Sequence, residues 1–445
     1  MTLRFFEGAA GTGKTHNIIE EARSLVAQNI LGAHGRILAL TFMNGARRRL
    51  LFRLGQHREF RRSYECQTFD VFARRLVVRR QSVLRRRDEL RAQAEPLGEF
   101  DGPCCLAAGL LDDQGIRRWV AASYPLVLVD EAQDLDVHRS GILRPLTESA
   151  HAIAGADEFQ CLYDGRDTRE LMEWLAGTGE TTRLTDPMRT DQAGLLAAAN
   201  AIRNGQDVRA ILRQSDRAQN PTWYANGFRL VEAPAANAGI VGWNIANQMR
   251  NCQGPIAILT PDSRNQLLLD ALTMVNERAW GKDGNTFGPF RFEWEDRDED
   301  TARNLADRID FPDQTDYDEC IDVLRPHEEH AAVAAVMGRV RRRRRAFGQL
   351  EFRREHITAL IEDAVRNQAR HSARSRRGNI AMTIQRAKNR EFPNVIVLWP
   401  HSATGSNEHR RRLLYNAVTR ATGHCSVVVV GQGLCNRPPF VPEGA

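Results

Sequence analysis

The segment Gly8-Ala9-Ala10-Gly11-Thr12-Gly13-Lys14-Thr15 constrains the fold of this 445-residue chain more than any other stretch. A short strand-like run, residues 3–6, precedes it, and apolar residues at helical spacing follow it. A glycine-rich turn between a strand and a helix lets successive backbone N–H groups surround phosphate oxygens at the helix N-terminus. The pattern therefore predicts a phosphate-binding loop in which Lys14 reaches the β- and γ-phosphates of a nucleotide and the Thr15 hydroxyl holds Mg²⁺. The other candidates for nucleotide contact are Gly8, Gly11, Gly13 and His16.

A buried strand is predicted for residues 124–129, and it ends on the acidic sequence Asp130-Glu131-Ala132-Gln133-Asp134. An enzyme that binds nucleotide through a phosphate loop needs one carboxylate to complete the Mg²⁺ shell and another to accept a proton from the attacking water. We assign Asp130 to the metal and Glu131 to the water. A helix N-cap is the alternative for Asp130 by itself, but it does not explain the strand and the phosphate loop together.

The composition limits the class of protein. A chain of this length is long enough for two or three domains with large buried cores. It has no apolar run of 18 residues, and its first predicted strand begins at residue 3, so we expect a cytoplasmic protein without a membrane span or signal peptide. Its eight cysteines form no C-x-x-C pair, so neither a zinc site nor a disulfide framework is indicated.

Basic residues are numerous and almost all are arginine. The formal net charge is +6, and lysine occurs only at positions 14, 282 and 388. A GC-rich genome explains such a bias, but the phosphate loop has kept a lysine where a compact ammonium group is suitable. Residues 77–118 are helical in pattern and strongly basic, which suits either a solvated face or contact with a phosphate backbone. Phe42 lies in the strand predicted for 36–44, and Phe69 lies in the aromatic and basic segment 67–76. Both suit either a buried core or a surface that stacks on bases.

Seven separated segments resemble, in order, the motifs of the UvrD/Rep/PcrA branch of superfamily-1 helicases. The acidic segment matches that family's DEAQD in full, and the phosphate loop matches its first motif. Together the segments cover about a fifth of the residues but span almost the whole chain. They are 8–15, 41–46, 130–134, 156–163, 187–190, 383–392 and 415–421.

The resemblance implies an α/β fold with two RecA-like parallel-sheet cores, each carrying a mainly helical insert. Nucleotide would bind between the cores, and single-stranded DNA would cross their tops. The first core would be 1–181, with a helical insert near 77–118. The second would be 182–272 together with 377–445, and residues 273–376 would form an inserted accessory domain. That insert holds an acidic run, 293–300, and a basic run, 339–345, which suit pairing with each other, a partner, DNA or solvent.

The resemblance also implies roles for residues that the pattern alone does not assign. Gln160 would sense the γ-phosphate, Arg189 and Arg420 would reach it from the second core, and Glu391 would contact the nucleotide near the ribose. Such arginines stabilise charge on the transferring phosphoryl group. The family's DNA path matches Phe42, Asn44, Thr68 and Phe69, and Tyr163 and Arg166 are further candidates for nucleic-acid contact.

Several positions depart from the family pattern. Only seven residues precede Gly8, so the upstream glutamine segment that reads adenine is not seen, and Met188 stands where a tyrosine would stack on the base. Gly165 stands where an aromatic residue would stack on DNA. These departures leave the hydrolytic residues intact but weaken the case for base reading and strand separation.

The sequence therefore predicts an ATP-dependent single-stranded DNA translocase or helicase that uses Mg²⁺ and hydrolyses ATP or other NTPs. Its expected partner is single-stranded or forked DNA, and RNA stays open as the track. The alternative is a DNA- or nucleotide-sensing NTPase subunit beside a TOPRIM/OLD-type nuclease, as in Gabija-type antiviral defence, with little unwinding of its own. No nuclease motif is visible in this chain.

Overall fold

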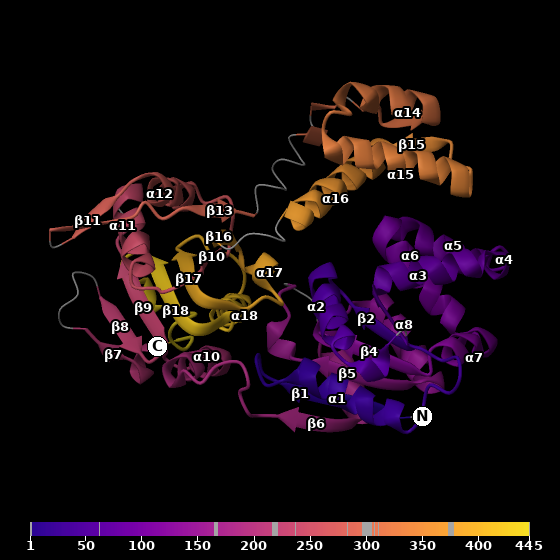
Figure 1. Cartoon of the computed structure of the whole chain (residues 1–445), viewed down its shortest axis with the longest axis horizontal. Helices are drawn as coiled ribbons and strands as arrows, with labels where there is room; N and C mark the ends of the chain where they lie inside the picture. The colour runs from indigo at the N-terminus through magenta and orange to yellow at the C-terminus, as the bar shows by residue number, and fades with distance from the viewer. Residues whose placement is uncertain are drawn as a thin grey trace.

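Two separate sheets organise the chain, as the computed structural model in Figure 1 shows. Each sheet has its own hydrophobic core and its own covering helices, and a third, helical unit lies above the first core. The structure describes residues 2–61, 63–163, 168–215, 221–235, 237–282, 284–295, 305–306, 308–309, 311–372 and 378–444.

The first sheet has six strands in the order β3-β2-β4-β5-β1-β6, and all neighbours are parallel. The carboxyl ends of parallel strands meet at one edge, which is where open α/β sheets bind their ligands. Because β4, β5 and β1 are adjacent, the segments that follow them are brought together there. The strands are β1 (Leu3–Gly8), β2 (Ile37–Thr41), β3 (Tyr64–Thr68), β4 (Leu126–Asp130), β5 (His151–Ala156) and β6 (Glu180–Leu184).

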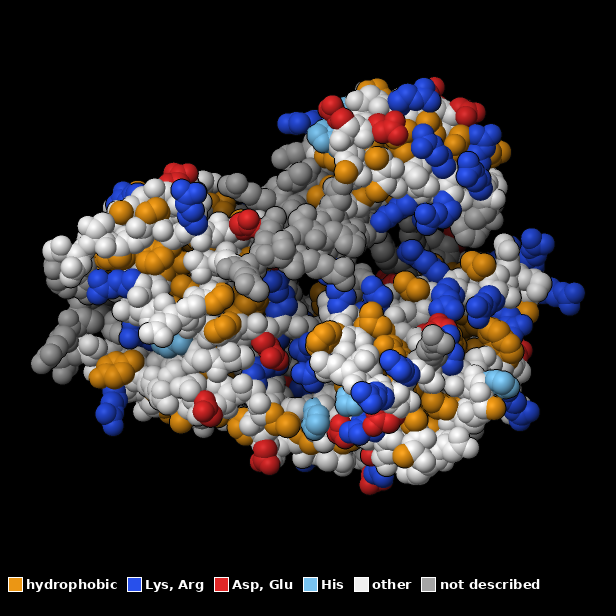
Figure 2. Space-filling model, in the orientation of Figure 1, with side chains coloured by type: hydrophobic (Ala, Val, Ile, Leu, Met, Phe, Trp, Pro, Cys, Tyr) orange, Lys and Arg blue, Asp and Glu red, His pale blue; other side chains and the backbone are white. Residues whose placement is uncertain are grey.

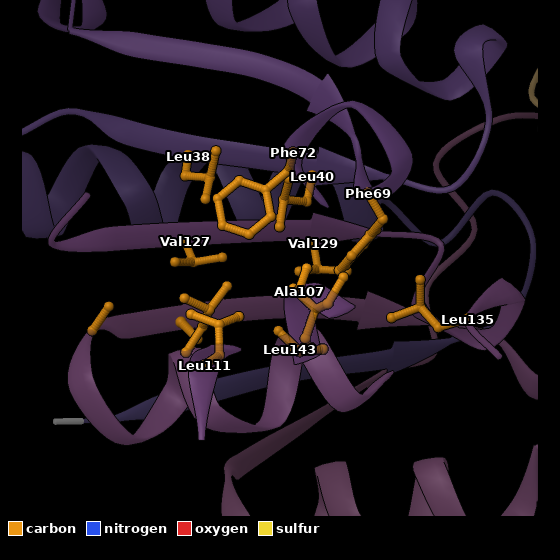
Figure 3. Packing of buried hydrophobic residues seen from close by; sticks show 14 of the residues in the cluster. Leu38, Leu40, Phe69, Phe72, Ala107, Leu111, Val127, Val129, Leu135 and Leu143 are labelled. Atoms are coloured by element: carbon orange, nitrogen blue, oxygen red, sulfur yellow. The ribbon is translucent and has the colours of Figure 1, made fainter. Parts of the chain in front are cut away.

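Helices cover both faces of the first sheet, as a buried parallel sheet requires. On one face α1 (Lys14–Ala27) and α2 (Asn44–Gly55) pack against apolar side chains such as Ile37 and Leu128. On the other face Leu38, Val127 and Val129 contact the helices that follow β3 and β4 (Figure 3). These helices are α3 (Phe69–Arg79), α6 (Gly98–Leu111), α7 (Gln114–Ser123) and α8 (Val137–Ser149).

The helical insert predicted near 77–118 corresponds to the run of helices between β3 and β4. Besides α3, α6 and α7 it contains α4 (Gln81–Leu84) and α5 (Asp88–Ala94). After β5, helix α9 (Arg169–Thr178) leads into β6. The first core is thus a parallel α/β unit with helices inserted on one side.

The second sheet has eight strands in the order β13-β16-β10-β17-β18-β9-β8-β7. The six strands from β13 to β9 are parallel, and β8 and β7 add an antiparallel edge. The prediction of two α/β cores built on parallel strands is therefore confirmed. The strands are β7 (Arg213–Gln214), β8 (Thr222–Ala225), β9 (Phe228–Ala233), β10 (Ile256–Thr260), β13 (Phe292–Trp294), β16 (Asn379–Thr383), β17 (Phe392–Pro400) and β18 (Ala421–Val430).

Helices also cover the second sheet. One of them, α10, ends where Gly205 adopts a left-handed conformation (φ 66°). The covering helices are α10 (Ala193–Asn204), α11 (Ala238–Met249), α12 (Gln266–Glu277), α17 (Ile384–Ala387) and α18 (Asn407–Val418). Between α12 and β13, the hairpin of β11 (Trp280–Lys282) and β12 (Asn285–Phe287) extends from the sheet.

The third unit is a small helical domain with a core of its own. Its helices α14 (Tyr317–Leu324), α15 (Ala331–Phe347) and α16 (Arg354–Ser372) pack together, and β14 (Gln314–Asp316) pairs with β15 (Glu351–Arg353). In Figure 1 it lies across a gap from α5 and α6 of the first core. Most of the acidic run 293–300 lies outside the described residues, whereas the basic run 339–345 lies on α15.

Two strands cross the predicted domain boundaries. β6 pairs with β1 through Leu184, so the first sheet extends past residue 181. Its sequence, Glu-Thr-Thr-Arg-Leu, has no buried residue, and main-chain pairing rather than an apolar pattern recruits it. Likewise β13 belongs to the second sheet although it lies within 273–376. Among the described residues, no helix is both long and apolar enough to cross a membrane.

Candidate active site

The phosphate loop joins β1 to α1, and its glycines are required by its shape. Gly11 and Gly13 have φ values of 81° and 84°, a conformation that side chains disfavour. A Cβ on Gly11 would lie 2.9 Å from the Arg189 Cβ, and one on Gly13 would collide with the Met188 thioether. The amide of Met188 also donates a hydrogen bond of 2.7 Å to the Gly11 carbonyl. The second core therefore packs directly on the loop.

Lys14 is buried beneath the loop. Its ammonium donates to the carbonyl oxygens of Gly8 (2.8 Å) and Ala9 (3.0 Å), and the residue is 7% exposed. Burial lowers the pKa of Lys14, and the carboxylates of Asp157 and Glu131 oppose that shift. The loop thus already holds the cation that the sequence predicts for the β- and γ-phosphates.

The two predicted Mg²⁺ ligands are in direct contact. The Thr15 hydroxyl donates to Asp130 Oδ2 at 2.9 Å, although 115 residues separate them. Burial, and then the neighbouring charge of Glu131, raise the pKa of Asp130, so this carboxylate is stabilised by a nearby cation. One hydroxyl and one carboxylate oxygen at the edge of a phosphate site form the partial set of hard ligands that Mg²⁺ uses with substrate phosphates. The residues present therefore fit Mg²⁺.

Glu131 is held in an unusual conformation. Its φ is 61°, which is uncommon outside glycine and is typical of constrained functional positions. The Gln133 amide donates to its Oε2 at 2.6 Å. Burial favours the neutral acid, but the cations of Lys388, Lys14 and Arg49 outweigh it and lower the pKa of Glu131 to about 2. The side chain is therefore ionised at neutral pH and fixed in orientation.

Two arginines of the second core face these residues. The Arg189 guanidinium donates to the Thr419 carbonyl (2.7 Å) and to Glu391 (3.0 Å). Arg420 is only 2% exposed, and its Nε donates to the Asn416 carbonyl at 3.0 Å. Burial and then the charge of Arg189 lower the pKa of Arg420 to about 9, so it stays protonated at neutral pH.

Except for Asp130, which lies behind Thr15, these groups line one cavity between the two cores. Its volume is about 280 Å³, and its walls come from the phosphate loop, α2, the ends of β4 and β5, and the second core. His16 and Glu391 line it as the sequence predicts, whereas Gly8 does not. The lining residues are Gly11, Gly13, Lys14, Thr15, His16, Arg49, Arg53, Glu131, Gln160, Met188, Arg189, Glu391 and Arg420.

A buried ion pair that the sequence does not predict joins the cores beside this cavity. Lys388 Nζ lies 2.5 and 2.7 Å from the two oxygens of Asp134, and it donates to the Gln160 carbonyl at 3.1 Å. Both side chains are almost fully buried. The rarity of lysine in the sequence could have pointed to this ion pair. The chain has three lysines, of which one lies in the phosphate loop and another is Lys388.

A tyrosine of the second core also contacts the loop. The Tyr415 hydroxyl accepts from the Ala10 amide at 2.8 Å and from Arg203 at 3.3 Å, and Arg203 also donates to Asp157 at 2.7 Å. Burial raises the pKa of Tyr415 to about 12, so its hydroxyl stays protonated. Tyr415 lies in the segment 415–421, but its contact with the loop was not predicted.

The residues predicted to contact nucleic acid fall into two groups. Phe42 and Tyr163 meet edge to face with ring centroids 5.5 Å apart, and Tyr163 is 37% exposed, so this pair offers an aromatic surface. Phe69, in contrast, is fully buried in the first core (Figure 3). Thr68 caps α3 by accepting a hydrogen bond from the Val71 amide.

The prediction that Phe69 stacks on bases is therefore wrong for this structure, because its ring fills the interior between β4 and the insert helices. The same burial removes Thr68 from the surface, since it is 5% exposed. Arg166 and Gly165 lie outside the described residues, as does the side chain of Asn44.

Two family models match the chain. The UvrD/REP helicase N-terminal domain matches residues 4–96, which include the phosphate loop and α2. The UvrD-like helicase C-terminal domain matches residues 380–428, which include Lys388, Glu391 and Arg420. No curated protein matches the chain significantly. These two matches support a UvrD/Rep-like superfamily-1 helicase, which implies an NTP-hydrolysing enzyme that depends on DNA.

Proposed function

We propose that this protein is an ATP-dependent translocase on single-stranded DNA, which hydrolyses NTP with Mg²⁺ between its two cores. The observation that carries the proposal is the shared cavity, where Lys14 and Glu131 of the first core face Arg189 and Arg420 of the second. Hydrolysis at such a site needs both halves, so closing and opening of the cores follows the nucleotide state. Stepping along a strand is the motion that this coupling serves.

The test is the rate of NTP hydrolysis by the purified chain alone, with single-stranded DNA, with duplex DNA and with RNA. Stimulation of at least about tenfold by single-stranded DNA is expected, because closure orients the arginines on the γ-phosphate. Stronger stimulation by RNA would change the assigned track. Hydrolysis that no nucleic acid alters would contradict translocation while leaving the NTPase assignment in place.

The surface offers a second feature that suits nucleic acid. A cavity of about 850 Å³ lies between the insert helices and α15, and its lining includes the cations Arg74, Arg91 and Arg343 beside the carboxylates Asp88 and Glu95. Figure 2 shows basic side chains on both sides of the hollow between these lobes. Arginines at such a site bind phosphate oxygens without reading base edges.

We expect binding to single strands to depend on salt and hardly on sequence. Contacts from arginine to phosphate release counterions, and the Phe42–Tyr163 surface would stack on any base. Titrating one oligonucleotide between 50 and 200 mM salt should weaken affinity by about tenfold or more. Affinity that is flat across this range, or that varies strongly among oligonucleotide sequences, would contradict this binding mode.

We expect weak discrimination between nucleobases. Met188, 61% exposed, lines the cavity beside Gly13, and its thioether donates no hydrogen bond and accepts one only weakly from a base edge. A site without such bonds leaves no polar group unpaired when the wrong base enters, so turnover of GTP should lie within roughly tenfold of ATP. The measurement is kcat/KM for both nucleotides. A hundredfold preference for ATP would reveal a base-reading group elsewhere.

A strand-displacement assay distinguishes a helicase from the alternative function, an NTPase subunit that acts beside a nuclease. The helical insert and the domain of α14–α16 are small, so they offer limited surface to grip a duplex. We therefore propose slow unwinding by the chain alone. Efficient unwinding would support a self-sufficient helicase, whereas DNA-stimulated hydrolysis without unwinding would favour an NTPase subunit that acts beside a nuclease.

A further inference from the structure

Arg203, in the last turn of α10, extends from the second core to the first. Its Nη1 donates to Asp157 Oδ1 at 2.7 Å and to the Tyr415 hydroxyl at 3.3 Å. Asp157 directly follows β5 of the first core, and its side chain is fully buried. Burial opposes the charge of Arg203, but Asp157 and then Tyr415 outweigh it and raise the pKa of Arg203. A charged hydrogen bond therefore joins the two cores at a position outside the seven segments that resemble helicase motifs.

An aromatic contact between the same two cores surrounds this ion pair. The Phe159 ring of the first core meets the Tyr415 ring edge to face, with centroids 5.2 Å apart. The Cζ atoms of Arg203 and Arg411 each lie 5.4 Å from the centroid of the Phe159 ring, within cation-π distance. Arg411 also donates to the Ile202 carbonyl at 3.1 Å, at the end of α10. These contacts restrict the orientation of the Arg203 side chain.

Through Asp157, Arg203 is connected to the residue proposed to accept the proton from water. The Asp157 amide donates to Gln133 Oε1 at 3.1 Å, and Gln133 Nε2 donates to Glu131 Oε2 at 2.6 Å. Gln133 and Asp157 are 0% and 1% exposed, so bulk water does not compete for these bonds. The direction in which the Glu131 carboxylate points therefore depends on the position of the backbone at Asp157.

Through Tyr415, the same guanidinium is connected to the phosphate loop. The Ala10 amide donates to the Tyr415 hydroxyl at 2.8 Å. A hydroxyl oxygen accepts up to two hydrogen bonds, so Ala10 and Arg203 share this one. The Arg203 guanidinium thus contacts both the start of the chain of bonds that orients Glu131 and the group that holds the loop against the second core.

We propose that Arg203 is a positioning residue, which orients Glu131 for hydrolysis only while the second core is docked on the phosphate loop. The proposal deepens the proposed function and rests on it, because it requires that NTP is hydrolysed in the cavity between the cores. Arg203 does not line that cavity, so it acts through Asp157 and Gln133 rather than by contact with nucleotide. Movement of the cores away from each other breaks its contacts, which restricts hydrolysis to the docked state.

The test measures kcat of the full chain with single-stranded DNA and the Kd for ATP at equilibrium. Arg203→Gln removes the charge and should lower kcat by about tenfold while the Kd changes by less than about threefold. Arg203→Lys restores a cation for Asp157 without the planar fork, so it should recover part of the loss. The matched control is Arg209→Gln, because Arg209 pairs with Asp207 within the second core, and its kcat should equal that of wild type.

A double-mutant cycle with Glu131→Gln distinguishes positioning from a purely structural role. If Arg203 acts by orienting the Glu131 carboxylate, it has nothing left to orient once that carboxylate is removed. Arg203→Gln should then lower the residual single-turnover rate of Glu131→Gln by less than about twofold. An equal loss in the wild-type and Glu131→Gln backgrounds would show that Arg203 only stabilises the fold, and would overturn the proposal.

The remaining outcomes separate this proposal from the proposed function. If wild type hydrolyses ATP and Arg203→Gln keeps the wild-type kcat, the proposal fails and the proposed function stands. If wild type hydrolyses no NTP with any nucleic acid, both fail. Thermal unfolding shows whether each variant is folded. Should Arg203→Gln not fold, Asp157→Asn removes the charge from the other side of the ion pair, and the same cycle with Glu131→Gln decides.

Discussion

Replacing Glu131 with glutamine is expected to lower kcat by about 10²–10⁴-fold while the protein still binds Mg²⁺ and nucleotide. The glutamine keeps the size of the side chain and the contact with Gln133, but it cannot accept a proton from water. Thr15 and Asp130, which would hold the metal, are untouched. The variant should therefore accumulate as a nucleotide-loaded, stalled enzyme.

The companion variant Lys14→Ala should fail for a different reason. It removes the buried ammonium at the phosphate loop, so nucleotide affinity itself should fall, together with hydrolysis. Single-turnover hydrolysis and equilibrium binding distinguish the two variants. The exposed Glu173→Gln on α9 is the control for loss of a carboxylate. Near-normal turnover in either active-site variant would refute the assignment.

Removing Arg189 or Arg420 is expected to lower kcat about a hundredfold or more, with little change in nucleotide affinity. Both guanidinium groups come from the second core and line the cavity, so their proposed contact with the γ-phosphate would depend on how that core is held against the first. Their effect should then appear in the transition state rather than in the ground state. The measurements are kcat by steady-state hydrolysis and Kd by equilibrium binding.

Two further variants test whether the effect is specific to Arg189 and Arg420. Arg183→Ala removes a solvent-exposed arginine on β6, which pairs with Glu7, and should leave kcat unchanged. Because Arg420 is buried, Arg420→Lys is the second variant: it keeps a cation but loses the planar fork, and it should still lower kcat. A higher KM with an unchanged kcat in the Arg189 and Arg420 variants would show that these arginines are structural.

Features that depend on residues close together in the sequence could be predicted. The phosphate loop needs glycines within a few residues of one another, and a strand that ends in Asp130 and Glu131 is visible as an apolar run that stops on acids. Parallel pairing of β1, β5 and β4 then brings Thr15 and Asp130 together, as the spacing of the motifs implied. The two α/β cores were expected from the resemblance to the helicase family, and the two sheets confirm them.

Other features could not be seen because their cause lies in distant segments. β6 has a polar sequence and becomes a strand only because β1 offers an open edge. Phe69 comes directly after β3, a position where an aromatic side chain can be exposed at the edge of a sheet. In the structure the insert helices cover its ring. The local sequence shows the periodicity of a segment, but it does not show which other segments will pack against it. The exposure of a side chain therefore cannot be predicted from the local sequence alone.

The sequence by itself indicated the residues of the proposed chemistry: a phosphate loop with its lysine, a hydroxyl that suits Mg²⁺, and a strand that ends in two carboxylates. These depend on backbone shape and residue type within a few positions, which a linear pattern preserves. The tertiary structure alone decided the electrostatics of the cleft. It placed Arg49 on Thr15 and paired Lys388 with Asp134, 254 residues apart, because the charge at a point in space sums over every segment that folding brings there.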